Sequence, residues 1–300
     1  MERIHIRFLR FSAFYSPLLM TMSAGCLAEE GLEATFDVVG PGRSIADGIA
    51  EGSVDVAQSA TAVSFDPWAE GLLLPFRHFA LMNRRDGFFL LRRGPADVAV
   101  GADGDAWTAL AGTTIVADHF FQPLALLRCA LSERGVDTSG VTFVDAGDPA
   151  AIEESFRSGT GDVVHLQGPA PQQLAHDGVG HLVGSVGEAA WEIAFSSLCA
   201  SPEWLATDVA AAFTRAFEKG RTLAREEHPD VVARSVAPYL PGIDHGPLTE
   251  AISAYQAMGT WSGGIEIDPA LYGRTVELFQ RFGGLAVTPS YDDVVAAVPR

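Results

Sequence analysis

Two stretches of this chain repeat one pattern, and the repeat limits the folds open to the chain more than any other feature. Residues 35–56 and 142–163 each read as a strand, a turn, a short helix, a glycine, an aspartate and a second strand. In the second copy Asp148 is placed as a helix N-cap, Pro149 as the first helical residue and Gly159 just past the helix. Strands and helices that alternate in this way build parallel sheets.

Each copy is preceded by one more strand and helix. Residues 4–8 follow the period of a strand, and 17–29 follow a helical pattern. Residues 113–117 and 123–134 repeat that order before the second copy. Each half of the chain is therefore predicted to be a β-α-β-α-β unit, whose right-handed crossovers place helices on both faces of one sheet.

The segments that join the two units indicate two lobes rather than one larger doubly wound sheet. Residues 78–93 hold two apolar runs around a polar turn, and 191–198 form a third strand-like run after the second unit. Paired runs on either side of a unit are what two crossing hinge strands would look like. We therefore predict an α/β protein in which lobe I is formed by 1–88 plus 195–300 and lobe II by 89–194.

The last third of the chain is predicted to be helical. One helix is expected to start at Ser201-Pro202, and longer helices are expected over 208–226, 247–258 and 269–282. We expect these helices to return to lobe I and pack on it.

Composition excludes several classes of function. The 300 residues are 48% apolar and carry a formal charge of −18, so a large core is available but the surface repels nucleic acid and anionic lipid. No apolar run reaches the roughly 18 residues of a membrane span. The three cysteines, Cys26, Cys129 and Cys199, form neither a disulfide framework nor a metal-ligand pattern. We expect a monomer that neither binds nucleic acid nor inserts into a membrane.

The first residues bear on where the protein works. Met1-Glu2-Arg3 leads directly into the first predicted strand, without the apolar stretch of a signal peptide. As written, the chain is expected in the cytoplasm. With an upstream start that encodes an export signal, it is expected in the periplasm.

Ligands of open parallel sheets bind beyond the carboxyl ends of the strands. Applied to the predicted strands, this rule selects four loops rich in aromatic and hydrogen-bonding side chains. Trp191, in the third strand-like run, can cover the cleft or the hinge. The predicted ligand contacts are Phe14, Tyr15, Ser59, Thr61, Asp118, His119, Phe120, Gln167 and Trp191.

Structural roles compete with ligand contact at these positions. Phe14 and Tyr15 suit packing between lobes, Ser59 and Thr61 suit capping, and His119 suits a hydrogen-bonded structural histidine. No pair of carboxylates, Ser-His-Asp spacing, metal-ligand spacing or phosphate-binding glycine loop stands out. No catalytic residue, metal ion or cofactor is therefore predicted.

Several short motifs resemble one family of proteins. The motifs are Phe14-Tyr15-Ser16-Pro17, the runs 28–33 and 52–57, and Ser201-Pro202-Glu203-Trp204-Leu205. They resemble the nitrate/sulfonate/taurine-type solute-binding proteins of ABC transporters and the related thiamine-pyrimidine synthase-like proteins. The resemblance implies the type II periplasmic-binding-protein fold, in which two lobes close on a small solute and deliver it to a membrane permease. It also implies ligand contacts at the loops named above.

The chain departs from the enzymes of this superfamily. The resemblance places the synthase's lysine near Ser59, its histidine near Val63 and its cysteine cluster near 187–192, and none of those residue types stands there. The desulfinase's cysteine would fall near Phe14. The single lysine of the chain, Lys219, lies far along it in a predicted helix.

Three functions fit these observations. The first is a solute-binding protein with an ABC permease as its partner, whose ligand is a heterocycle such as a thiamine-pyrimidine precursor, or a sulfonate; the aromatic residues beside Asp118 favour a neutral or partly cationic heterocycle. The second is a cytoplasmic enzyme on the same fold, with Asp118, His119 or His165 as acid–base groups. The third is a cytoplasmic sensor that acts through a protein partner. The first is favoured because the searches for catalytic groups find no specific pattern.

Overall fold

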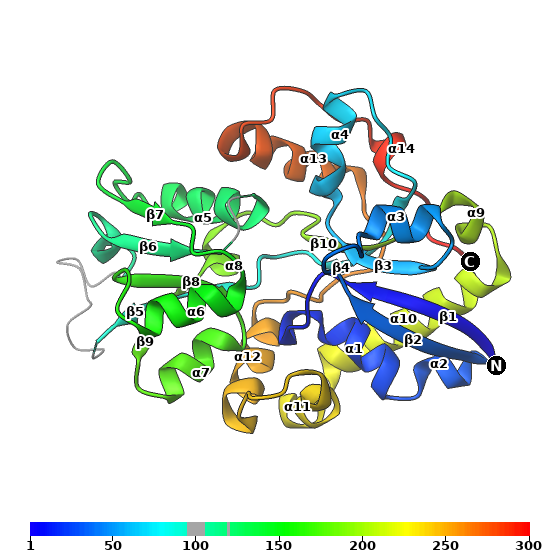
Figure 1. Ribbon diagram of the computed structural model, residues 1–300, viewed down its shortest axis with the longest axis horizontal. Helices are drawn as coiled ribbons and strands as arrows, with labels where there is room; N and C mark the ends of the chain where they lie inside the picture. Colours follow the sequence, from blue (N-terminus) through cyan, green and yellow to red (C-terminus); the bar gives the residue numbers. More distant parts are fainter. Residues whose placement is uncertain (95–105, 119–120) are drawn as a thin grey trace.

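Two five-stranded sheets lie side by side along the long axis of the molecule in the computed structural model, which describes residues 1–94, 106–118 and 121–300 (Figure 1). Their strand orders have the same form, β2-β1-β3-β10-β4 in one and β7-β6-β8-β5-β9 in the other. We call the part built on the first sheet lobe I and the part built on the second lobe II. The predicted two-lobed α/β fold class is confirmed.

The strands come from separate parts of the chain. In sheet order, those of lobe I are β2 (Leu32–Val38), β1 (Glu2–Phe8), β3 (Val56–Ser59), β10 (Ser196–Ala200) and β4 (Arg77–Asn83). Those of lobe II are β7 (Thr142–Val144), β6 (Thr114–Ala117), β8 (Val163–Gln167), β5 (Phe88–Arg93) and β9 (Gly180–Ser185). Strands β10 and β5 run antiparallel to both neighbours, and the remaining pairs are parallel. Each of these two strands is the one that the chain enters after crossing from the other lobe.

The predicted repeat is confirmed by the strand registers. Ile6 of β1 lies opposite Val56 of β3, and Ile115 of β6 lies opposite Val163 of β8. Val56 and Val163 are also the residues that end the two copies of the repeat. Equivalent sequence positions therefore occupy equivalent places in the two sheets.

The aspartate of each copy accepts a hydrogen bond from the backbone of the neighbouring strand. Asp55 accepts a hydrogen bond at Oδ2 from the backbone N–H of His5, at 2.7 Å, and Asp162 accepts one at Oδ2 from the N–H of Thr114, at 2.8 Å. Each carboxylate thus ties the beginning of one parallel strand to the beginning of the next. A charged acceptor on a backbone N–H makes one of the stronger hydrogen bonds in proteins.

Short helices connect the strands of both lobes. They are α1 (Ser16–Ser23), α2 (Cys26–Glu29), α3 (Ile45–Ala50) and α4 (Phe65–Ala69) in lobe I, and α5 (Gln122–Glu133), α6 (Pro149–Arg157), α7 (Ala170–His176) and α8 (Val186–Ala189) in lobe II. Asp148 caps α6 as predicted, because its side chain accepts from the N–H of Ala151. The single helix predicted over 17–29 is wrong: Gly25, at φ 82°, adopts a left-handed conformation that ends α1 before α2 begins.

The C-terminal helices reach both lobes. They are α9 (Pro202–Leu205), α10 (Asp208–Glu226), α11 (Pro229–Val236), α12 (His245–Ala257), α13 (Pro269–Leu278) with the π-helical turn η6 (Phe279–Gly283), and α14 (Tyr291–Val294). Helix α10 packs along α1 in lobe I, as predicted. However, α12 also contacts α7, and η6 contacts α5, so the expectation that all of these helices pack on lobe I alone is corrected.

Three segments pass between the lobes and are bonded to one another. The strand predicted over 191–198 begins only at Ser196, because the residues before it run beside the β4–β5 connection: Phe195 N–H donates to the carbonyl of Asn83. The third segment follows α12, where the carbonyl of Thr260 accepts from the N–H of Arg84. The predicted lobe boundaries, at 88/89 and 194/195, stay predictions, and Phe88 belongs to β5 in the sheet of lobe II.

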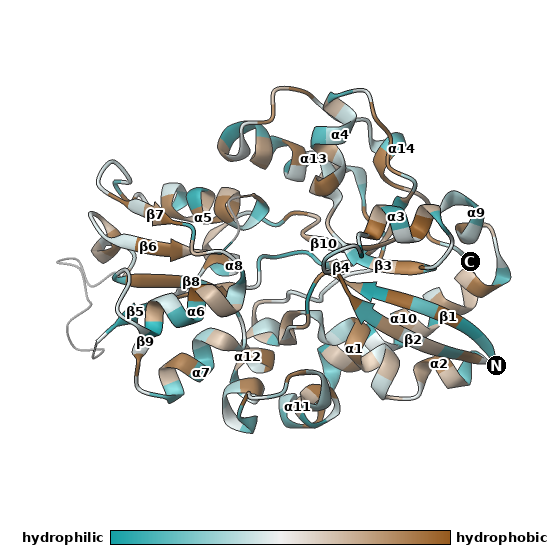
Figure 2. Ribbon diagram, viewed as in Figure 1, coloured by the Kyte–Doolittle hydropathy of each residue, from teal (hydrophilic) through white to brown (hydrophobic). Residues whose placement is uncertain are grey.

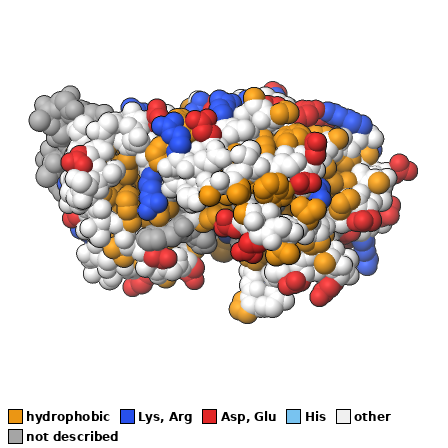
Figure 3. Space-filling model, turned by 90° about the horizontal axis from the view of Figure 1, so that it is seen from above, with side chains coloured by type: hydrophobic (Ala, Val, Ile, Leu, Met, Phe, Trp, Pro, Cys, Tyr) orange, Lys and Arg blue, Asp and Glu red, His pale blue; other side chains and the backbone are white. Residues whose placement is uncertain are grey.

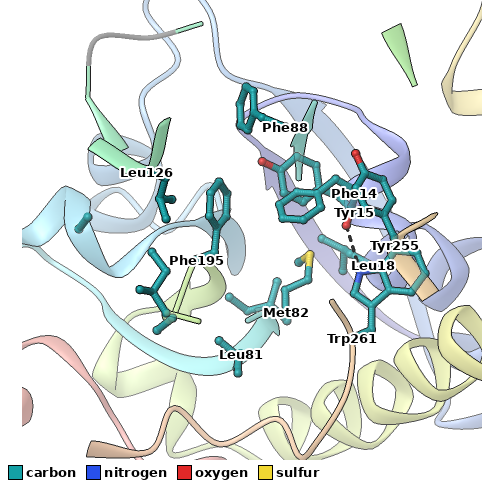
Figure 4. Close-up of a cluster of buried hydrophobic side chains, with 14 of the residues drawn as sticks. Phe14, Tyr15, Leu18, Leu81, Met82, Phe88, Leu126, Phe195, Tyr255 and Trp261 are labelled. Carbon is teal, nitrogen blue, oxygen red and sulfur yellow. Dashed lines mark hydrogen bonds between the residues drawn. The ribbon is translucent and has the colours of Figure 1, made fainter. Parts of the chain in front are cut away.

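Aromatic side chains join the lobes into one core (Figure 4). In Figure 2 the central strands β6 and β8 of lobe II are largely brown, as expected of strands that are buried within a lobe. The ring of Phe14 packs against Phe195, with ring centroids 5.1 Å apart, and against Tyr255, at 5.3 Å. Trp261 donates its indole N–H to the carbonyl of Phe14 at 3.2 Å. A side chain at Gly87 would place its Cβ 2.3 Å from the Phe14 ring, so glycine is needed where this ring crosses the hinge.

Charged side chains of both signs lie on the surface of the molecule. Among the described residues, none of the helices is both long enough and apolar enough to pass through a bilayer. The face seen in Figure 3 carries basic and acidic side chains interspersed with apolar ones.

Candidate functional site

A cavity of about 420 Å³ lies between the lobes. Its walls are Leu9, Arg10, Tyr15, Val39, Gln58, Ser59, Ala60 and Val63 from lobe I, Phe195 and Ser196 from the second crossing, and Phe88, Phe121, Gln122, Pro123, Asp148, Pro149 and Gln167 from lobe II. We call it the central cavity. It has the size of a small-molecule site and is enclosed mostly by apolar side chains with a few polar ones.

The lobe I wall is formed where β1 and β3 end. Gln58 and Ser59 are the last residues of β3, and Leu9 follows β1 directly. The side-chain oxygen of Gln58 accepts from the backbone N–H of Leu9 at 2.9 Å, which fixes the orientation of the amide. The NH₂ group of Gln58 is therefore the part of this side chain left for other partners.

The lobe II wall uses the equivalent ends of β8 and β6. Gln167 is the last residue of β8, and Gln122 begins α5 after β6. Gln122 donates its NH₂ group to the carbonyl of Phe195 at 2.9 Å, and its side-chain oxygen is left without a partner. Phe88, the first residue of β5, closes this wall with its ring.

An ion pair joins the lobes beside the cavity. Arg10 Nη1 lies 2.7 Å from Asp118 Oδ2, and Nη2 lies 3.2 Å from Oδ1, which is a two-pronged contact. Burial by itself would lower the pKa of Arg10, but the hydrogen bond and the charge of Asp118 outweigh it and raise that pKa. A second cavity, of about 380 Å³, lies behind the pair and shares Arg10 and Gln167 with the first.

Neutral hydrogen bonds join the lobes at the same place. Gln167 donates to the hydroxyl of Tyr15 at 3.4 Å, and Ser12 donates its hydroxyl to the carbonyl of Gly168 at 2.6 Å. Burial raises the pKa of Tyr15, so this phenol is un-ionised at neutral pH. Together with the Arg10 pair, these bonds hold the lobes closed around the cavity.

Three side chains of the cavity wall have a buried oxygen without a hydrogen-bond partner. They are Gln122 through Oε1, Gln167 through Oε1 and Ser196 through Oγ. A buried polar atom without a partner costs about 1–3 kcal/mol. A molecule that offers N–H or O–H donors to these oxygens would recover that free energy.

The structure brings some of the predicted residues together and places others elsewhere. Tyr15, Ser59 and Gln167 line the central cavity, and Asp118 lines the second one. Predicted residues His119 and Phe120 lie outside the described residues. Ligand contact by each predicted residue stays a prediction.

Three predicted residues have structural partners instead of a place in the cavity wall. Phe14 is fully buried in the aromatic packing between the lobes (Figure 4). Thr61 is also fully buried and donates its hydroxyl to the carbonyl of Ala194 at 3.2 Å. Trp191 lies under the guanidinium of Arg281, 4.8 Å from its ring centroid. For Phe14, this contact pattern supports the structural role considered in the sequence analysis, which is packing between the lobes.

Among the cavity-wall residues that sequence reasoning did not name as ligand contacts are Arg10, Phe88, Gln122 and Phe195. Arg10 and Gln122 stand in loops that the carboxyl-end rule selects, and that rule was available to find them. Phe88 and Phe195 lie at the crossings between lobes, where no sequence pattern indicates which side of the segment faces the cavity.

His165 is buried without a hydrogen-bond partner on either ring nitrogen. Its ring stacks on Phe88 with centroids 4.6 Å apart. Burial lowers the pKa of His165 to about 4, so the ring is neutral at neutral pH. The ring of Phe88, which lines the central cavity, therefore separates the imidazole of His165 from the cavity.

Neither the three cysteines nor Lys219 lines the central cavity. All three cysteines are buried, and burial raises the pKa of the Cys129 thiol to about 11. Lys219 pairs with Glu29 on the surface. In the described ranges no group of three or more His, Cys, Asp and Glu side chains is placed to hold a metal ion.

Comparison with known proteins supports the fold at low sequence identity. No family model matches the chain. The chain is 25% identical over 284 residues to the "Putative binding protein YtlA" of Bacillus subtilis (strain 168), a match that covers 93% of this chain and 82% of that protein.

Two solved structures share the fold over nearly their whole length. One is the ligand-binding component of an ABC-type import system from Staphylococcus aureus with zinc bound, at 17% identity and a TM-score of 0.72, covering 99% of this chain and 97% of that one. The other is the alkanesulfonate-binding protein SsuA from Xanthomonas axonopodis pv. citri bound to MOPS, at 14% identity and a TM-score of 0.69, covering 98% of each chain. The predicted resemblance to nitrate/sulfonate/taurine-type binding proteins is thereby confirmed at the level of the fold.

Proposed function

We propose that this chain, which has the fold of the periplasmic binding proteins of ABC import systems, is a solute-binding protein that closes its lobes on a small neutral heterocycle with N–H donors. The observation that carries the proposal is the central cavity, whose walls come from both lobes and whose unpartnered oxygens belong to Gln122, Gln167 and Ser196. An ABC permease is the partner that fits this function.

The charges around the cavity favour a neutral ligand over a sulfonate or nitrate. The charged side chains among its described lining residues are Arg10 and Asp148. Arg10 is held by Asp118 on both of its terminal nitrogens, and Asp148 caps α6. An anion is bound by cations or N–H groups that are free to face it. Among its described residues this wall offers the NH₂ group of Gln58 but no uncommitted cation, and its unpartnered buried atoms are oxygens.

The aromatic residues of the wall suit a planar ligand. Tyr15, Phe88, Phe121 and Phe195 all line the central cavity. Their rings provide apolar faces on which a flat heterocycle can stack, and a stacked pair contributes about 0.5–1.5 kcal/mol beyond the area buried. The glutamines would then read the edge of the ring through its N–H groups.

Binding without turnover is the better-supported activity. Of the acid–base candidates in the described residues, His165 is buried behind Phe88 and Asp118 is paired with Arg10. The proteins of similar fold named above are binding proteins rather than enzymes. We therefore expect a bound ligand to be released unchanged.

Calorimetric titration with two sets of compounds tests the proposal. The first set is 2-aminopyrimidine, cytosine and adenine, and the second is taurine, methanesulfonate and nitrate. We expect saturable one-to-one binding within the first set only, with the ligand recovered intact by chromatography. One-to-one binding of the sulfonates with no response to the heterocycles would overturn the ligand class, and conversion of a bound heterocycle would overturn a pure binding function.

A pair of matched variants ties binding to the cavity. Gln167→Leu removes a hydrogen-bonding side chain from the wall and is expected to weaken binding about tenfold. Gln280→Leu makes the same change at an exposed position of η6 and is expected to leave binding unchanged. Equal affinities for the two variants would place the ligand somewhere other than the central cavity.

A further inference from the structure

A second space on lobe I adjoins the central cavity. This space, of about 570 Å³, lies between the loop before α3 and the segment that leads into β4. It shares four lining residues with the central cavity: Leu9, Val39, Ser59 and Val63. We call it the lobe I groove. The four shared residues place the two spaces side by side, so a ligand that passes these residues would occupy both.

The walls of the lobe I groove differ in chemistry from those of the central cavity. Beyond the shared residues, the groove is lined by the apolar side chains of Ile45, Leu74 and Phe76 and by the exposed polar residues Arg43, Ser44 and Asp47. The hydroxyl of Ser44 is already used, since it donates to Asp47 Oδ2 at 2.7 Å and accepts from the N–H of Asp47. The apolar part of the groove rewards the burial of apolar surface.

Exposed apolar side chains stand next to this groove in the chain. Leu72 and Leu73 are 59% and 58% exposed and directly precede Leu74 in its wall. Single exposed leucines are ordinary, but two beside an open apolar groove add to the surface that an apolar group would cover. Apolar side chains also gather toward the lobe I side of the face seen in Figure 3.

We propose that the ligand has two parts, a hydrogen-bonding head in the central cavity and an aliphatic arm in the lobe I groove. This inference rests on the proposed function and names a narrower class of ligand, N–H-bearing heterocycles with an alkyl substituent. The arm passes between Leu9 and Val63 and ends between Leu74 and Phe76. A head without an arm leaves the groove to water.

The test is a series of 2-aminopyrimidines with 5-alkyl chains of one to six carbons, titrated calorimetrically. Each methylene buried in the groove is expected to strengthen binding about three- to fourfold, until the chain reaches the end of the groove. Constant affinity along the series would overturn the proposal. So would the absence of binding by every member, because burial of a hexyl chain alone supplies measurable affinity.

Three variants locate the arm. Leu74→Gln and Ala46→Trp change residues that line the groove but not the central cavity, the first by adding a polar group and the second by filling space. Both are expected to remove the gain from the longer chains and to leave the methyl compound bound as in the parent. Val231→Gln, at an exposed apolar position on α11, is the control and should keep the full gain.

The outcomes separate this inference from the proposed function. If the chain-length gain survives in both groove variants, the arm lies elsewhere and the two-part ligand is overturned. If bare 2-aminopyrimidine binds and Gln167→Leu weakens it while chain length has no effect, the proposed function stands and this inference falls.

Discussion

The two lobes share one sheet topology but present different chemistry to the cavity between them. By strand register, Gln58 of lobe I corresponds to His165 of lobe II, since each stands two residues after the paired valines Val56 and Val163. Gln58 lines the cavity and is bonded to the loop after β1, whereas His165 has no partner and lies under the ring of Phe88.

A second pair of equivalent positions shows the same contrast. Leu9 follows β1 at the place where Asp118 follows β6. The apolar residue belongs to the cavity wall of lobe I, and the carboxylate of lobe II reaches across to Arg10. The fold therefore places equivalent strand ends of both lobes at the cavity. The side chains at these strand ends decide whether a position lines the cavity or bonds to the other lobe.

The largest expected effect comes from breaking the ion pair between Arg10 of lobe I and Asp118 of lobe II. Arg10→Gln leaves the buried Asp118 without its guanidinium partner and is expected to lower the free energy of unfolding by about 3 kcal/mol at neutral pH. Urea unfolding followed by circular dichroism measures it. The exchanged pair, Arg10→Asp with Asp118→Arg, should recover part of the loss. A single variant as stable as the parent would mean that the lobes do not depend on this pair.

A smaller effect on stability is expected from His165→Gln, which gives lobe II the residue type found at the equivalent position of lobe I, Gln58. Burial lowers the pKa of His165 to about 4, while an unfolded histidine titrates near 6.5. Between these values the unfolded chain takes up a proton that the folded chain does not, so stability is lost as the pH falls from 6.5 toward 4. His165→Gln removes this term, which is on the order of 2 kcal/mol.

Unfolding free energies at pH 7 and pH 4.5 check the effect of His165→Gln. The variant should lose less stability between these two pH values than the parent. If the unfolding free energy of His165→Gln falls as steeply with acid as that of the parent does, the neutral buried His165 does not contribute to the pH dependence of stability.

The smallest expected effect tests the lobe I member of the same pair. Gln58→Leu leaves the N–H of Leu9 without its acceptor and should cost about 1 kcal/mol of stability at any pH. The same variant should also weaken binding of 2-aminopyrimidine, measured by calorimetry, since Gln58 lines the central cavity. Unchanged affinity would show that recognition comes from lobe II alone.

Local patterns in the sequence were sufficient for much of the fold. The alternation of strand and helix and the N-cap at Asp148 express interactions between residues close in the chain. The repeated aspartates were visible as a motif, although the backbone N–H groups that they accept from lie 50 and 48 residues away. Neither α7 nor β9 was predicted, and the helix break at Gly25 was missed, because the intervening patterns there are short. The loops that the carboxyl-end rule selected contribute residues to the wall of the central cavity.

The sequence by itself determined which loops meet between the lobes, because strand direction follows from the repeat and places those loops at one edge of each sheet. Only the tertiary structure decided which side chain of each loop faces the cavity. Phe14 and Tyr15 are neighbours of similar shape, yet one is packed into the interface core and the other lines the cavity. Arg10 and Asp118 stand 108 residues apart. Their pairing depends on two lobes closing, and closure is a property of the packed core rather than of any local stretch of chain.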